Sequence, residues 1–171
     1  MPVDIQPPCV SLKKSPRDTI ADHFKSVGEL PIRGGWGYTV EDALIIDKND
    51  TIVQKGIPFD GVGLEYIFVE KRIYEELIIS CPANDRSSGI RWNLLEQKLT
   101  SHNDRQYDML TFEVTALRDS DYEELKAEWE GPKGYGSPGF DADAHIKKRN
   151  SRTIRYVTEY CFDITSFYGS E

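Results

Sequence analysis

The stretch that decides the fold is IRWNLLEQKLTSHNDRQYDMLTFEVTAL, residues 90–117. Two segments of strand-like composition, 90–100 and 107–117, are joined by the polar residues 101–106. The second segment carries apolar side chains at alternate positions, namely Leu110, Phe112, Val114 and Ala116. Because successive side chains of a strand point to opposite faces of a sheet, this spacing predicts one buried and one wetter face. The stretch therefore predicts a β-hairpin.

Clear signals for a strand and a helix lie on either side of this hairpin. Residues 152–169 alternate aromatic and β-branched side chains, which predicts a long strand. Near the start of the chain, Ser15 is an N-cap residue, Pro16 suits the first helical position and Gly28 ends an apolar pattern of helical spacing. We therefore expect a helix over 15–28.

Three further segments complete the expected elements. Alternating apolar residues predict a strand over 36–47, and the segment 121–131 predicts a short helix capped by Asp119 or Ser120. The segment 64–79 fits either a helix or a strand, and its length and its charged composition favour the helix.

Together these elements predict an α+β fold in a single domain over residues 15–171. A mainly antiparallel sheet is typical of chains in which strand pairs are adjacent in sequence and the helices are separated from them. We expect about four to six strands, with two to four helices packed on the sheet. The chain of 171 residues has the ordinary length of one domain. Residues 1–14 carry three prolines and little periodicity, which predicts an extended N-terminal arm.

The composition favours a protein partner over a nucleic acid. The formal net charge is −8 and the isoelectric point is about 5.0, whereas a protein that binds a phosphate backbone needs clustered Lys and Arg. An acidic surface increases solubility and suits a basic protein partner. The sequence shows neither a signal peptide nor a membrane span, and its three widely spaced cysteines form neither a disulfide framework nor a zinc motif. These features predict a cytoplasmic protein without a cofactor.

Aromatic residues provide the candidate binding surface. Several are flanked by glycine, proline or charged residues, a context that favours positions near the surface. Tyr and Trp at a surface supply the large and stiff contact area that interface hot spots favour. The candidate binding residues are Trp36, Tyr38, Trp129, Tyr135 and Phe140.

The run Asp141, Asp143 and His145 is a candidate metal or acid–base site. In an extended segment these alternate side chains would point the same way, and two carboxylates with an imidazole suit a divalent metal. The competing interpretation is that Asp141 or Asp143 caps a helical turn, with basic residues at the far end of that turn.

Two functions of different classes are consistent with these patterns. The first is a small acidic cytoplasmic protein-binding domain, such as an inhibitor or immunity-type protein that neutralises a basic partner. The alternative is a metal-assisted hydrolase that uses Asp141, Asp143 and His145, with Glu130 as a further carboxylate. Since no nucleophile or phosphate-loop motif occurs, a binding function is the more expected one. Long strands with free edges also make a homodimer conceivable.

Overall fold

A computed structural model of the chain describes residues 3–4 and 15–169. Within these ranges the helices are α1 (Pro16–His23), α2 (Gly61–Tyr74), α3 (Asp119–Glu130) and α4 (Ala142–Arg152). A π-helical turn, η1 (Glu75–Ile79), extends α2, and a 3-10 turn, η2 (Ala83–Asp85), follows it. The strands are β1 (Val3–Asp4), β2 (Ile32–Gly34), β3 (Leu44–Ile46), β4 (Ser87–His102), β5 (Arg105–Arg118) and β6 (Ile154–Asp163).

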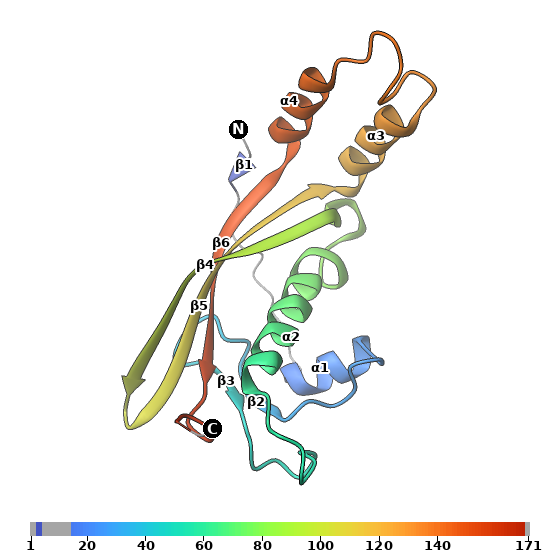
Figure 1. The fold of residues 1–171 in the computed structure, drawn as a ribbon. Coiled ribbons are helices and arrows are strands. Elements are labelled where there is room, and N and C mark those ends of the chain that lie inside the picture. Colours follow the sequence, from blue (N-terminus) through green and yellow to red (C-terminus); the bar gives the residue numbers. More distant parts are fainter. Residues whose placement is uncertain (1–2, 5–14, 170–171) are drawn as a thin grey trace. The chain divides into compact units, whose positions relative to one another are not determined.

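The described strands form one sheet in the order β2-β3-β6-β5-β4, and β1 pairs with β6. Strand β2 is antiparallel to β3, with Ile32 opposite Ile46, while β3 runs parallel to β6, with Leu44 opposite Phe162. Figure 1 shows β4 and β5 as a long hairpin and β6 running against β5. The predicted α+β class with a mainly antiparallel sheet is therefore confirmed.

The chain divides into two compact units. The first contains Met1–Cys9, Glu75–Asn93 and Glu113–Val157, and the second contains Val10–Tyr74, Leu94–Phe112 and Thr158–Glu171. Strands β4, β5 and β6 therefore contribute residues to both units. Except for residues 3–4, the predicted arm over 1–14 lies outside the described residues, and the single domain over 15–171 stays a prediction.

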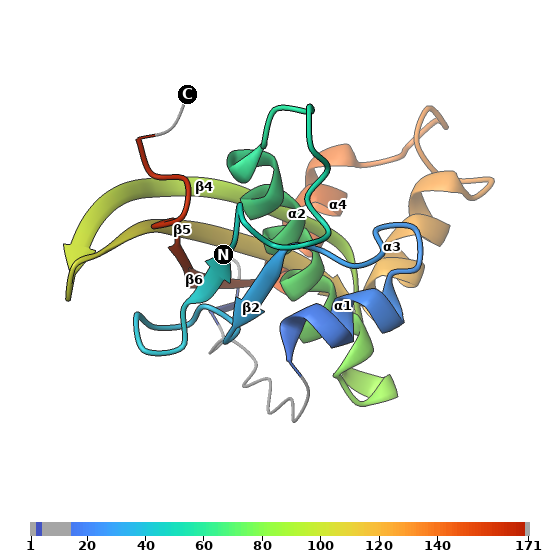
Figure 2. The ribbon, with the colours of Figure 1, turned by 90° about the horizontal axis from the view of Figure 1, so that it is seen from below.

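The core of the second unit forms where α2 packs on the sheet. The ring of Phe68 on α2 lies 5.9 Å from that of Trp36 and 5.8 Å from that of Phe162 on β6. Phe112 on β5 meets Tyr160 on β6 edge to face, with ring centroids 5.5 Å apart. Figure 2 shows α2 and the sheet from below. Within residues 15–169, no helix is long and apolar enough to cross a membrane.

Several elements form at the positions that the sequence predicts. The Ser15 hydroxyl accepts a hydrogen bond from the Asp18 N–H at 3.2 Å and so caps α1, which ends at His23 rather than at Gly28. The segment 64–79, which fitted either a helix or a strand, is helical through α2 and η1. The predicted β-hairpin and the long C-terminal strand are confirmed as β4, β5 and β6.

The strand predicted over 36–47 is wrong, because only β3 (Leu44–Ile46) forms there. The Asp42 carboxylate accepts hydrogen bonds from the backbone N–H and the hydroxyl of Thr39, at 2.7 and 3.1 Å. Gly37 adopts a φ of +82°, a left-handed conformation that a regular strand does not contain. A turn therefore replaces the first half of the expected strand.

The predicted cap of α3 is also wrong. Asp119 is already helical, and the N-cap position is Arg118, which makes no side-chain capping bond. The Asp119 carboxylate instead accepts a hydrogen bond of 2.6 Å from the Ser88 hydroxyl on β4. This tertiary contact takes the place of the local cap.

Candidate binding surface on the α3–α4 hairpin

Helices α3 and α4 form a helical hairpin in the first unit, between β5 and β6 in the chain. Lys148 on α4 forms ion pairs with Glu124, at 2.8 Å, and with Glu128 on α3. Arg152 on α4 pairs with Glu124 and, at 3.2 Å, with Asp121. An exposed pair contributes only about 0.2–1 kcal/mol, so this network chiefly fixes how the two helices align.

The segment before α4 is a helix cap. Asp141 is the N-cap residue, and its Oδ1 accepts a hydrogen bond of 3.0 Å from the Ala144 N–H. Asp143 lies in the first turn of α4, and basic residues occupy the last turn, as the charges of a helix dipole favour. Of the two interpretations of this run, the structure shows the cap.

The three candidate metal ligands point to different surroundings. Asp141 is engaged in the cap, Asp143 is exposed, and the ring of His145 lies among aromatic rings. Among the side chains of residues 15–169, no three His, Cys, Asp or Glu residues are grouped so that they could hold a metal ion. The geometry of this segment therefore provides a helix start rather than a shared ligand set.

Three of the predicted binding residues come together at the end of the hairpin. Trp129 and Tyr135 stack with ring centroids 4.4 Å apart and planes 9° apart. Phe140 meets Trp129 edge to face at 5.7 Å, and the His145 ring lies 5.2 Å from that of Trp129. We call these four residues the aromatic cluster. The sequence predicts His145 as a metal ligand, and no local pattern indicates that it packs against aromatic rings.

The loop between the helices brings the aromatic cluster together. The Tyr135 N–H donates a hydrogen bond of 2.9 Å to the carbonyl oxygen of Trp129, which turns the chain back over the end of α3. A Cβ atom at Gly134 would collide with that same carbonyl group. Glycine is therefore required at position 134 for Tyr135 to reach Trp129.

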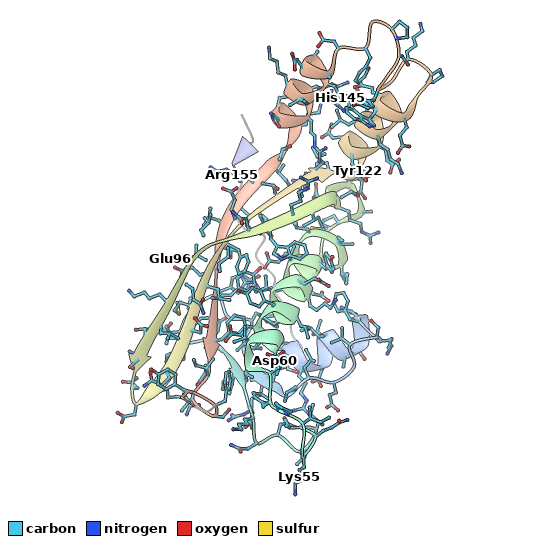
Figure 3. All side chains as sticks on the ribbon, in the orientation of Figure 1. Lys55, Asp60, Glu96, Tyr122, His145 and Arg155 are labelled. Carbon is cyan, nitrogen blue, oxygen red and sulfur yellow. The ribbon has the colours of Figure 1, made fainter. Side chains whose placement is uncertain are left out.

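A groove of about 290 Å³ lies between the facing sides of α3 and α4. Its lining is mostly apolar and aromatic, with two cations, and includes Tyr122, Leu125, Lys126, Trp129, Ile146 and Arg149. Figure 3 labels Tyr122 and His145, one on each helix. The exposed part of the aromatic cluster is thus continuous with an apolar groove that has positive groups on its wall.

The other two predicted binding residues, Trp36 and Tyr38, belong to the second unit. Trp36 is 7% exposed and packs on Phe68. The Arg72 guanidinium lies over the rings of both Tyr38 and Tyr160, and its central carbon is 4.0 and 3.6 Å from the two ring centres. The structure therefore does not bring these two residues to the aromatic cluster.

Arg72 is a fully buried cation that the sequence patterns did not reveal. Its guanidinium donates hydrogen bonds to the Trp36 carbonyl at 3.2 Å, the Thr158 hydroxyl at 2.7 Å and the Glu159 carbonyl at 2.8 Å. These acceptor oxygens replace the water that a buried charge loses. The role of Tyr38 is consequently to cover this cation in the core.

A buried carboxyl pair, Glu65 on α2 and Asp108 on β5, is a second cluster that sequence reasoning missed. The two residues are 1% and 3% exposed, and the Gln97 amide donates a hydrogen bond of 2.7 Å to Asp108. Burial, the charge of Asp108 and a hydrogen bond to it raise the pKa of Glu65 to about 9. One signal was present, since Asp108 continues the buried alternation of Leu110 and Phe112.

This pair differs from the aromatic cluster in its access to solvent. Glu65 is a neutral acid at pH 7 and can donate a hydrogen bond, a property that some active sites use. Both carboxyl groups are nearly solvent-free in the described structure, so the proton of Glu65 affects the stability of the fold rather than the binding of an external ligand. The aromatic cluster and its groove are the more accessible site.

No protein-family model matches this chain, and neither a curated protein nor a solved structure matches it.

Proposed function

We propose that the protein is a small cytoplasmic protein-binding domain and that the aromatic cluster with its groove is the contact surface. The observation that supports this proposal is the exposure of the stacked pair, 38% for Trp129 and 66% for Tyr135. Aromatic side chains at the centre of an interface bury a large area and lose few rotatable bonds on binding.

The aromatic cluster is held in place before any partner arrives. Tyr135 is stacked on Trp129, the loop is fixed by the hydrogen bond between these residues, and Asp141 caps α4. Ordering side chains and loops is a main cost of association, about 0.5–1.5 kcal/mol for each immobilised side chain. A surface that is already ordered avoids much of this cost, which favours binding here.

The charges support a partner of a particular kind. The net charge of −8 would attract a basic protein over long distances, as expected for an inhibitor or immunity-type protein. At short range, Lys126 and Arg149 line the groove. We infer a partner that is basic overall and that inserts an apolar side chain flanked by carbonyl or carboxylate oxygens.

Affinity capture with matched variants tests the contact surface. Tyr135→Ala removes an exposed ring of the aromatic cluster, whereas Tyr168→Ala removes a 50% exposed ring of the second unit and serves as the control. We expect one partner to be recovered at low salt with the wild type and with Tyr168→Ala. With the purified partner, Tyr135→Ala should weaken binding about tenfold or more in calorimetry.

Equal binding by Tyr135→Ala and Tyr168→Ala would show that the aromatic cluster is not the contact surface. The basic character of the partner has its own test, a titration of salt from about 0.05 to 0.5 M, over which the screening length shortens several-fold. Affinity for a basic partner should fall across this range. An affinity that does not change with salt would refute the basic character of the partner. It would not affect the proposal that the aromatic cluster is the contact surface.

A further inference from the structure

Strand β4 is a long strand at an edge of the sheet. It spans 16 residues, while the strand at the other end of the order, β2, spans three. Natural proteins protect free edges by keeping them short, by covering them or by placing charges on them, because unpaired N–H and C=O groups recruit further strands. Figure 1 shows β4 on the outer side of β5. Within the described residues no strand pairs with the outer edge of β4, so an edge of this length is open to a pairing partner.

The segment Leu95–Leu99, sequence Leu-Glu-Gln-Lys-Leu, carries the side chains that such a partner would meet. Leu95 and Leu99 are 51% and 58% exposed and share one face of the strand. Glu96 and Lys98 share the other face and are both exposed, and Figure 3 labels Glu96. All five residues belong to the second unit, whereas the residues of the α3–α4 hairpin belong to the first.

The turn after β4 determines which backbone groups face outward. It consists of Asn103 and Asp104, whose φ angles of 48° and 62° are those of a tight type I′ turn. In a two-residue hairpin the residues next to the turn form a hydrogen-bonded pair, and bonding then recurs at every second residue. Counted back from His102, the residues with outward N–H and C=O groups include Leu95, Gln97 and Leu99.

We propose that this edge binds the same edge of a second copy of the chain, antiparallel, with Gln97 opposite Gln97. In this register the outward backbone groups of the two strands face one another. Leu95 of each copy lies opposite Leu99 of the other, and Glu96 lies opposite Lys98 of the other. The segment is therefore complementary to itself in hydrogen bonding, apolar contact and charge.

Charge also selects this register over its neighbours. Of the two adjacent registers that keep the outward backbone groups paired, one places Glu96 opposite Glu96 and the other places Lys98 opposite Lys98. Like charges directly opposite one another are destabilising in an antiparallel pair, whereas opposite charges are stabilising. The Gln97 register forms the ionic pair twice, because the two-fold axis repeats it.

Charge exchange tests this dimer without disturbing the core, since both charged residues are exposed. The state of association would be measured by sedimentation equilibrium over a concentration series. We expect a wild-type dimer whose dissociation constant rises roughly tenfold in Glu96→Lys and equally in Lys98→Glu, since each change turns two attractive pairs into repulsive ones. The double variant, Glu96→Lys with Lys98→Glu, should dimerise like the wild type.

Glu123→Lys on α3 is the control, because it changes the net charge as Glu96→Lys does but leaves β4 intact. Its dimer should be unaffected. A wild-type chain that stays monomeric at every concentration would overturn the proposal, as would a dimer that neither single reversal weakens. Circular dichroism of each variant separates loss of pairing from loss of fold.

Discussion

At the scale of single residues, Glu65 illustrates how a polar group in the core affects stability. It lies on α2, where a glutamate would ordinarily face water, yet it is 1% exposed beside Asp108. Two ionised carboxylates so close together and so deeply buried would repel one another, so Glu65 retains its proton. The folded chain therefore binds a proton at neutral pH that the unfolded chain releases.

Substitution of Glu65 by Gln should change how stability depends on pH. The pKa of Glu65 is about 9 in the folded chain, against an ordinary value of 4.5, so between these pH values only the folded state holds the proton. The wild-type free energy of unfolding should then fall, by up to about 1.4 kcal/mol per pH unit, as the pH rises. Gln keeps a hydrogen-bond donor for Asp108 and does not titrate. The free energy of unfolding of Glu65→Gln, relative to that of the wild type, should therefore increase as the pH rises.

Urea unfolding at pH 5 and pH 8 measures this effect. Glu70→Gln, on the same helix, is the control, because Glu70 is more exposed and pairs with Lys71. Parallel pH dependences of the wild type and Glu65→Gln would contradict the assigned protonation state.

Gly134 is the second residue whose replacement has a definite expected outcome. Because a Cβ atom there would meet the Trp129 carbonyl, Gly134→Ala should displace the loop and separate Tyr135 from Trp129. We expect a loss of about 1–3 kcal/mol in stability and a weaker near-ultraviolet circular dichroism signal from the stacked rings. Gly136→Ala separates backbone strain from atomic collision. Gly136 has a φ of +87°, which strains any other residue, but a Cβ atom there would meet no neighbouring atom.

At the scale of elements, the start of α4 depends on one side chain. Asp141→Ala removes the side-chain cap at the N-terminus of this helix and should cost about 1 kcal/mol of stability. Asp141→Asn retains an equally good cap and should be nearly neutral. Thermal unfolding of both variants measures the difference. Equal losses would mean that the charge of Asp141, rather than its hydrogen bond to the Ala144 N–H, stabilises the helix.

The sequence predicted best those elements whose burial follows a simple period. Alternation predicted β5 and β6 because each strand has one buried face, and the cap at Ser15 predicted the start of α1. The alternation over 36–47 predicted a strand that does not form, since Gly37 and the Thr39–Asp42 turn redirect the chain. A period-two pattern shows which side chains are apolar, but it does not show that the backbone between them is extended.

The same distinction explains the candidate binding residues. Trp129, Tyr135 and Phe140 are neighbours in sequence, and a loop bounded by two helices is enough to bring them together. Trp36 and Tyr38 are placed by Arg72, which lies 36 residues from Trp36 in the chain. No local pattern reveals a contact of that kind, nor does one reveal that Glu65 will lie against Asp108.

At the scale of the whole molecule, the two proposed interactions use different residues, so a dimer would carry two copies of the aromatic cluster. Two linked sites raise the apparent affinity for a surface that displays many partner molecules. If both proposals hold, Glu96→Lys should dissociate from a densely coated partner surface at least tenfold faster than the wild type. Its affinity for the free partner in solution should fall no more than that of a variant with the same net charge and an intact β4. Surface plasmon resonance at high and low coating density makes the comparison.

Unchanged dissociation of Glu96→Lys from the dense surface would show that the dimer does not present both clusters at once. An affinity in solution lower than that of a variant with the same net charge would mean instead that β4 itself contacts the partner. Glu41→Lys, at an exposed position of the second unit outside β4, controls for net charge here, because Glu123 lies on the hairpin that carries the proposed contact surface.

The position of the α3–α4 hairpin also affects how the sequence of this chain could diverge during evolution. The hairpin leaves the sheet at the end of β5 and re-enters it at the start of β6, and these two strands are neighbours. An insertion between adjacent strands can lengthen, shrink or be exchanged without altering the order of the sheet. Recognition could therefore diversify in residues 119–152 while the strand framework is inherited, and a designer could graft foreign helical hairpins at the same two ends.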